Sequence, residues 1–174
     1  MLDEAQKRLV QFQFDLKARG HQVAIMTDAA SIAYLAGFWG YLSIEFGRPT
    51  MLLVYADADP VVLTPLMESE MVGAMTWVQG VETWEDLGPN RWEAVLARIL
   101  GAKPSRIGIE KNLIPAIVQN MLTETYPGTA LDDISPILGQ RRMIKSDAEI
   151  EVMRQTGKIA GAMMQAAVYP LMES

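Results

Sequence analysis

Residues 49–65 read PTMLLVYADADPVVLTP, and this stretch gives the strongest indication of the fold. Two apolar runs, residues 49–56 and 60–65, are separated by the turn-forming residues Asp57, Ala58, Asp59 and Pro60. Two strand-forming runs joined by such a turn predict an antiparallel hairpin. Because both runs are almost wholly apolar, we expect two central strands of a sheet.

Helical and strand patterns alternate on both sides of this hairpin. On the N-terminal side we expect a helix over 3–19, a strand over 21–26 and a helix over 28–37, with Asp28 as its cap and Gly37 as its end. On the C-terminal side we expect helices over 66–75, 91–102 and 116–126 and strands over 76–80, 81–84 and 106–110. Alternation combined with a hairpin predicts an α/β fold with a mixed β-sheet flanked by helices.

Composition limits the function classes. The chain has 174 residues, is 50% hydrophobic and carries a net charge of -6, with no cysteine and one histidine. Such a chain can bury a core, and its acidity argues against nucleic acid or an anionic membrane surface as partner. Cysteine-based catalysis, disulfides and thiolate metal sites are excluded, and the lack of cysteine fits a cytoplasmic location. The N-terminal charges and the absence of an 18-residue apolar run predict neither export nor a membrane span.

The last predicted helix starts sharply at a capping box formed by Ser146 and Glu149. Two apolar stripes follow on nearly opposite faces, one through residues 150, 153, 157, 164 and 168 and one through 152, 159, 163 and 166. A helix on the surface of a finished domain needs only one stripe. The pattern therefore indicates an oligomer interface, a helix lying across the sheet, or a helix whose partner layer belongs to a further domain.

No catalytic or metal site is predicted within the chain. His21 is expected to be a surface turn residue, and Asp132 and Asp133 to cap the helix that follows them. Glu68 and Glu70 are expected on a solvated helix face. Ser43 and Ser69 lack the surroundings of a catalytic serine, and no phosphate-binding glycine motif occurs.

Three blocks of sequence resemble one known family. The block QRRMIKSDAEIEVMRQTGKIAGA, residues 140–162, resembles the domain junction of creatinases, prolidases and Xaa-Pro aminopeptidases, through Arg142, Ile144, Lys145, Ser146, Glu149, Ile150, Met153 and Arg154. The block at 20–38 resembles the first strand and helix of the same family through Gly20, Asp28, Ile32, Tyr34, Leu35, Gly37 and Phe38. The segment at 125–142 resembles its approach to the junction.

The resemblance implies a two-domain metallohydrolase subunit. Residues 1–140 would form the non-catalytic N-terminal domain, and residues 141–174 the junction and the first helix of a C-terminal "pita-bread" domain that is otherwise missing here. That missing domain would hold two divalent ions (Mn, Co or Zn), and this chain would hold none. The N-terminal domain would mediate a homodimer and contribute to substrate recognition in the neighbouring subunit. The parent would be a metal-dependent hydrolase of Xaa-Pro peptides or of a small amide or amidine such as creatine.

The resemblance also points to three candidate substrate contacts. Phe46, Gly47 and Arg48 resemble a motif of creatinases and related amidohydrolases, in which the Phe and the Arg reach a small substrate across the dimer. An aromatic residue at the position of Trp39 resembles peptidase members. From residue types alone, Phe46 equally fits an edge-of-sheet core position, Arg48 a solvated strand leader and Trp39 a packed loop residue.

Two other readings stay open on sequence. The chain could be an autonomous small-molecule-binding α/β module, which requires the last helix to pack fully within its own chain. It could also be an interaction protein that keeps only this domain. The sequence beyond Ser174 in the encoding gene would separate these readings.

Overall fold

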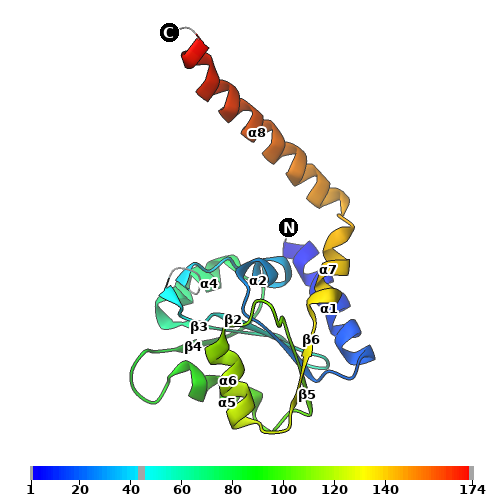
Figure 1. Cartoon of the computed structure of the whole chain (residues 1–174), viewed down its shortest axis with the longest axis vertical. Helices are drawn as coiled ribbons and strands as arrows, with labels where there is room; N and C mark the ends of the chain where they lie inside the picture. The colour runs from blue at the N-terminus through cyan, green and yellow to red at the C-terminus, as the bar shows by residue number, and fades with distance from the viewer. Residues whose placement is uncertain (1, 43–45, 173–174) are drawn as a thin grey trace. The chain divides into compact units, whose positions relative to one another are not determined.

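The computed structural model describes residues 2–42 and 46–172, which belong to two compact units, Met1–Leu138 and Gly139–Ser174. The first unit contains, in chain order, α1 (Leu2–Ala18), β1 (Val23–Met26), α2 (Ala29–Ala36), β2 (Met51–Tyr55), β3 (Val61–Pro65), the 3-10 turn η1 (Leu66–Glu68), α4 (Ser69–Met75), β4 (Gly80–Trp84), α5 (Trp92–Leu100), β5 (Arg106–Ile109), α6 (Ala116–Thr125) and β6 (Ala130–Asp133) (Figure 1). The helix α7 (Ser135–Met143) spans the boundary, and α8 (Asp147–Met172) lies in the second unit.

The six strands form one mixed sheet in the order β4-β3-β2-β1-β5-β6. Strand β2 is antiparallel to both of its neighbours, whereas β1, β5 and β6 are mutually parallel and β3 is parallel to β4. All strands except β2 therefore run in one direction. The predicted mixed α/β fold is confirmed, and so is the hairpin of β2 and β3.

Period-two alternation in the central strands builds a separate core on each face of the sheet. Ala24, Met26, Leu52 and Val54 face a cluster with α1, α2, α4 and α7, whereas Val23, Ile25, Met51 and Leu53 face α5 and α6. The helices accordingly lie in two layers with the sheet between them (Figure 1). Because both faces of the central strands are covered, those strands are apolar throughout.

Two strand predictions need correction. Residues 76–79 are not a strand, and a single strand, β4, replaces the two predicted segments. Thr76 and Trp77 instead use their side chains to donate hydrogen bonds to the carbonyls of Ala36 and Leu35 at the end of α2. Strand β6 was not predicted, because Ala130–Asp133 is short, half acidic and lies at the edge of the sheet.

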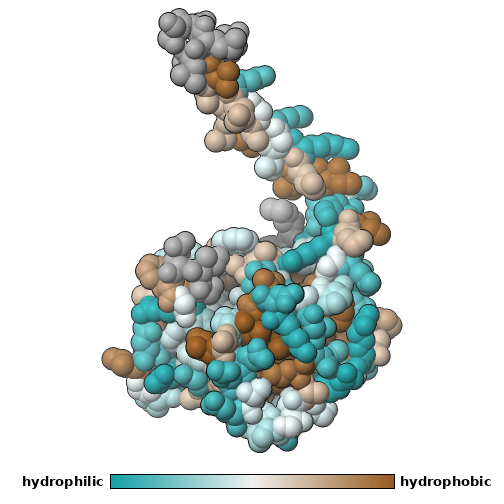
Figure 2. All heavy atoms as spheres, in the orientation of Figure 1, coloured by the Kyte–Doolittle hydropathy of each residue, from teal (hydrophilic) through white to brown (hydrophobic). Residues whose placement is uncertain are grey.

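The capping box of α8 is confirmed. The Ser146 N–H donates to Glu149 Oε2 at 2.7 Å, and the Glu149 N–H donates to Ser146 Oγ at 3.3 Å. The side chains of residues 151–168 are exposed, and apolar and polar ones are mixed along the helix (Figure 2). Both predicted apolar stripes are among them except for Ile150, which is half-buried; Met153 is 59% and Ile159 62% exposed. Within residues 2–42 and 46–172, no helix is both long enough and apolar enough to span a membrane.

Candidate functional site: the connection between α2 and β2

Because β2 runs opposite to the other strands, several loops lie at one edge of the sheet, the one formed by the carboxyl ends of the other strands. The connections after β1, β3, β4 and β5, together with the one that enters β2, all lie at this edge. Ligands of open α/β sheets bind outside the carboxyl ends of the strands, which meet here. The three candidate contacts from the sequence, Trp39, Phe46 and Arg48, all lie on the connection from α2 to β2 and hence at this edge.

Local sequence fixes where this connection begins. Asp28 caps α2 by accepting the Ser31 N–H at 2.9 Å, and the helix ends at Gly37, whose positive φ of 79° is the left-handed conformation that favours glycine. Both predictions for this helix are confirmed. The chain leaves α2 into the loop at a defined place.

Side chains alternate inward and outward along residues 38–42. Phe38, Gly40 and Leu42 are buried, whereas Trp39 and Tyr41 are each 51% exposed. A Cβ added at Gly40 would lie 2.9 Å from the Phe38 ring and 3.4 Å from Glu68 Oε2, so the backbone passes close over both. The two exposed aromatic side chains therefore share the outer side of this segment.

A buried carboxylate lies beneath the loop. Glu68, at the end of η1, is only 2% exposed and accepts the hydroxyls of Thr50 and Thr64 on Oε2, at 3.1 and 2.9 Å. Its Oε1 accepts the Leu42 N–H at 3.4 Å. The prediction that Glu68 lies on a solvated face is wrong, because donors from three separate segments compensate its burial. Glu70 is exposed as predicted.

Arg48 is held by contacts from two further loops. Its Nη2 donates to Asp86 Oδ2 at 2.6 Å, and its Nη1 lies 3.0 Å from Met67 Sδ. Trp84 fixes the backbone next to Arg48 by donating from Nε1 to the Pro49 carbonyl at 2.9 Å. These residues line a hollow of about 310 Å³ together with Leu66. Asp86 was not identified from the sequence.

Phe46 lies on the same connection but projects into solvent. Its side chain is 67% exposed, which does not fit an edge-of-sheet core position. Trp39 is likewise exposed on the outer side of its segment. The structure thus places the three candidates on one connection, whereas the polar partners of Arg48 are Asp86 and Met67. Ser43 lies outside the described residues.

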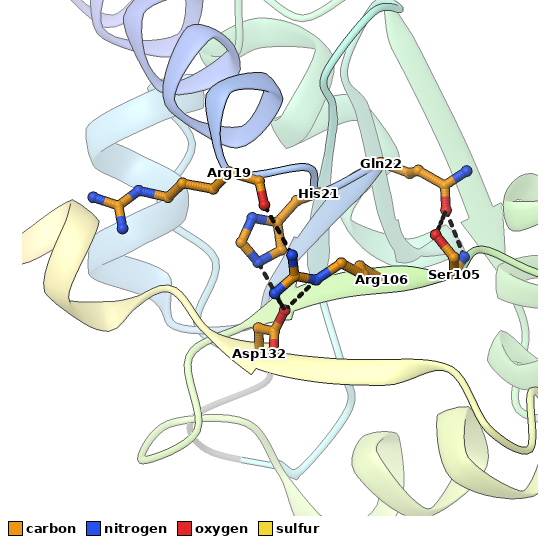
Figure 3. A network of polar contacts seen from close by, with 6 residues as sticks. All are labelled: Arg19, His21, Gln22, Ser105, Arg106 and Asp132. Carbon is orange, nitrogen blue, oxygen red and sulfur yellow. Dashed lines mark hydrogen bonds and ion pairs between the residues drawn. The ribbon is translucent and has the colours of Figure 1, made fainter.

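A second polar network occupies the ends of β1, β5 and β6 (Figure 3). His21 is 6% exposed and its Nε2 lies 3.2 Å from Asp132 Oδ2, which also accepts Arg106 Nε at 2.8 Å and Nη2 at 2.7 Å. Arg106 Nη1 also donates to the Arg19 carbonyl at 3.0 Å. His21 is therefore a buried residue at the end of α1, and the prediction of a surface position is wrong.

The electrostatics of this network oppose one another at His21. Burial is the largest single influence and lowers the pKa of the imidazole from its ordinary value of 6.5, whereas the neighbouring Asp132 carboxylate raises that pKa. Arg106 and Arg19 add to the lowering. The arrangement favours a neutral imidazole that packs against an ion pair of Arg106 and Asp132.

The two adjacent aspartates have different roles. Asp133 accepts the N–H of Ser135 at 3.0 Å and its hydroxyl at 2.6 Å at the start of α7, and these bonds lower the pKa of Asp133 from 3.8. The capping prediction is therefore correct for Asp133 and wrong for Asp132. In the part of the chain that the structure describes, no three His, Cys, Asp or Glu side chains gather as a metal site. These residues do not fit a two-metal centre, and we assign no metal-dependent step to them.

Comparison with known proteins matches most of the chain to one family. The Creatinase/Prolidase N-terminal domain matches residues 8–144. An uncharacterised hydrolase/peptidase of Sinorhizobium fredii, y4tM, is 26% identical over 95% of this chain and 44% of its own length. The chain spans less than half the length of the curated relatives it matches.

Solved structures share the fold. The N-terminal domain of an X-Pro dipeptidase from Streptococcus pyogenes superimposes with a TM-score of 0.67 and 24% identity, covering 78% of this chain and 98% of that one. A prolidase from Thermococcus sibiricus superimposes with a TM-score of 0.78 and 19% identity, covering 97% of this chain and 44% of that one. The latter match includes α8, since it extends over nearly the entire chain.

Proposed function

Because the chain belongs to the creatinase/prolidase N-terminal domain family, we propose that it is the non-catalytic domain of a longer metal-dependent hydrolase of Xaa-Pro peptides. In this proposal the connection between α2 and β2 contacts substrate in the active site of a neighbouring subunit. The observation that carries the proposal is that the connection exposes Trp39 and Phe46 and also carries Arg48, which Asp86 holds in place.

The chemistry of the connection supports a role in recognition. Arg48 has five N–H donors: one on Nη2 donates to Asp86 and one on Nη1 to Met67, which leaves three N–H groups that these two contacts do not use. The remaining donors can bind a carboxylate such as the C-terminus of a dipeptide, and guanidinium binds carboxylate through paired hydrogen bonds. The exposed aromatic side chains on the same connection can supply apolar contact area for the rest of a small substrate.

The comparisons support peptides over creatine as substrate class. The matched proteins are named as a hydrolase/peptidase, an X-Pro dipeptidase and a prolidase. The proposed homodimer and the two divalent ions would belong to the longer protein, and a cytoplasmic location stays a prediction. The exposed apolar side chains of α8 are available for a partner surface, which is consistent with a chain that continues into a second domain.

The test is a pair of arginine variants in the full-length protein. We expect Arg48→Ala to raise KM for an Xaa-Pro dipeptide by about tenfold or more, because it removes a charge-assisted hydrogen bond to the substrate carboxylate. The matched control is Arg98→Ala, which also removes an exposed ion pair, with Glu82 at 3.0 Å on a different part of the surface. Unchanged KM and kcat in the Arg48 variant would remove Arg48 from the site.

A further inference from the structure

The carboxylate of Glu68 connects the sheet to the exposed aromatic segment. Two of its donors, Thr50 and Thr64, come from the β2 and β3 hairpin, and the third is the backbone N–H of Leu42. Leu42 is 5% exposed and is the last buried residue before the undescribed residues 43–45. Its carbonyl in turn accepts the N–H of Arg48 at 3.3 Å. Two consecutive hydrogen bonds therefore connect the Glu68 carboxylate to the backbone of Leu42, and the backbone of Leu42 to that of Arg48.

We propose that Glu68 is a positioning residue: by accepting the Leu42 N–H, it fixes residues 38–42 so that Trp39 and Tyr41 are displayed together on the substrate side. Tyr41 thereby becomes a further contact residue beside Trp39. Only the assignment of this side of the loop to substrate rests on the proposed function, since the fixing of the loop depends on contacts within this chain alone.

Loss of the Glu68 carboxylate should affect the loop and not the hairpin, because their donors differ in the partners left to them. The hydroxyls of Thr50 and Thr64 lie 3.3 Å apart, so without the carboxylate they can bond to each other. Among the described residues, the acceptor of the Leu42 N–H is Glu68 Oε1, and a buried N–H that loses its acceptor is costly. Loss of the carboxylate should therefore release Leu42 and leave the hairpin paired.

The same geometry separates hydrogen bonding from charge. A glutamine at position 68 keeps one oxygen for the Leu42 N–H, and its amide group can donate to the two threonine hydroxyls, which accept as readily as they donate. A methionine at position 68 has similar length but no comparable acceptor. Glu68→Gln should thus preserve the loop, and Glu68→Met should release it.

Amide hydrogen exchange of the 174-residue chain tests the proposal directly. We expect Glu68→Met to accelerate exchange of the Leu42 amide about tenfold relative to the Ile25 amide in β1. In Glu68→Gln the Leu42 amide should exchange as slowly as in the parent chain. The matched control is Glu110→Met, because Glu110 is also 2% exposed and accepts a hydroxyl, that of Ser31 at 2.7 Å. The control should leave the ratio of the two amides unchanged. An unchanged ratio in Glu68→Met would overturn the positioning role.

A second variant keeps the test valid if Glu68→Met does not fold. Gly40→Ala leaves the carboxylate intact but places a Cβ 2.9 Å from the ring of Phe38, which is fully buried. The segment must then lift away, and the Leu42 amide should again exchange faster than that of Ile25. Equal protection of Leu42 in Gly40→Ala and the parent would contradict the close packing on which the proposal stands.

Kinetics of the full-length protein separate the two levels of the argument. We expect Glu68→Met to raise KM for an Xaa-Pro dipeptide several-fold and Glu68→Gln to leave it unchanged. Faster exchange of Leu42 with an unchanged KM would retain Glu68 as the loop anchor and reject the loop as a substrate contact. Slow exchange in every variant would reject the anchor whatever the kinetics.

Discussion

Replacing Gly108 with alanine should destabilise the first unit through one specific clash. Gly108 is in the interior of the sheet, on β5 between Ala24 of β1 and Asp132 of β6. A Cβ at this position would lie 2.5 Å from Ile134 Cγ2 and 3.4 Å from Ala24 Cβ. Non-bonded carbons pack at about 3.5–4.0 Å, so Ile134 would have to move by about 1 Å.

Ile134 has little freedom to move by that amount. It is fully buried, and its backbone N–H donates to the Ile109 carbonyl at 3.0 Å, which ties it to the residue of β5 that directly follows Gly108. Extra atoms in such a packed position cost about 1–3 kcal/mol of unfolding free energy. The loss should appear in urea denaturation followed by tryptophan fluorescence.

Two companion variants sharpen this measurement. Gly73→Ala makes the same chemical change in α4, where an added Cβ meets nothing within 4 Å, and should stabilise the chain by about 0.4–1 kcal/mol. Ile134→Ala removes Cγ2, so the double variant with Gly108→Ala should lose less stability than the sum of the two single losses, by about 1 kcal/mol or more. A Gly108→Ala variant within about 0.5 kcal/mol of the parent, or strict additivity, would refute the clash.

Three further predictions concern titration, capping and metal. Burial lowers the pKa of His21 in the folded state below its ordinary value of 6.5, which the unfolded state retains. Between the folded-state pKa and 6.5 the unfolded state therefore binds more protons than the folded state. The free energy of unfolding should thus fall as the pH decreases through this range. Urea titrations at pH 7.5 and 5.0 should show a smaller decrease in His21→Gln, and equal decreases would contradict the assignment. Ser146→Ala should speed amide exchange at Glu149, at a cost of about 1 kcal/mol to the start of α8, while unchanged exchange would show that the capping box is dispensable. The 174-residue chain should show no turnover of Xaa-Pro dipeptides, and two Mn, Co or Zn ions per chain together with peptidase activity would refute its non-catalytic role.

Apolar periodicity in the sequence was sufficient to predict five of the six strands and the helices that cover them. The runs around Asp57–Pro60 identified the hairpin because apolar strands and a polar turn are local properties. The cap at Asp28 and the end at Gly37 were also predictable, since the donor and the acceptor lie within one helical turn. Strand β6 escaped prediction because an edge strand of four residues carries too little alternation to be distinguished from a loop.

The buried polar groups could not be predicted because their partners are distant in sequence. Glu68 looks like a surface carboxylate until the hairpin brings Thr50 and Thr64 together and the loop adds Leu42. The one available signal was a threonine beside a proline in each of two otherwise apolar runs, Thr50 directly before β2 and Thr64 near the end of β3. His21 was misassigned for the same reason, since Asp132 joins it only through the pairing of β5 with β6.

Predicting the candidate site depended on resemblance to a family more than on residue chemistry. Phe46 and Arg48 have no distinguishing local pattern, and only the folded chain shows that one is exposed and the other is held by Asp86. Asp86 itself lies in the turn after β4, and its partner Arg48 is 38 residues earlier in the sequence. Long-range pairing of this kind is not contained in any local periodicity.

The reversal of β2 has a consequence for how such a domain can diversify. Strands β1 and β2 are antiparallel neighbours that a turn of two residues could join, yet residues 27–50 separate them. Both ends of this insert return to the same edge, so its length and sequence can change without altering the order of any strand. An insert from another protein can therefore be grafted between Met26 and Met51, provided that it retains a helix with the buried apolar face of α2, which includes Ile32 and Leu35, and a backbone N–H for Glu68. Altering recognition in this scaffold then becomes a problem of replacing one segment, with the sheet left as it is.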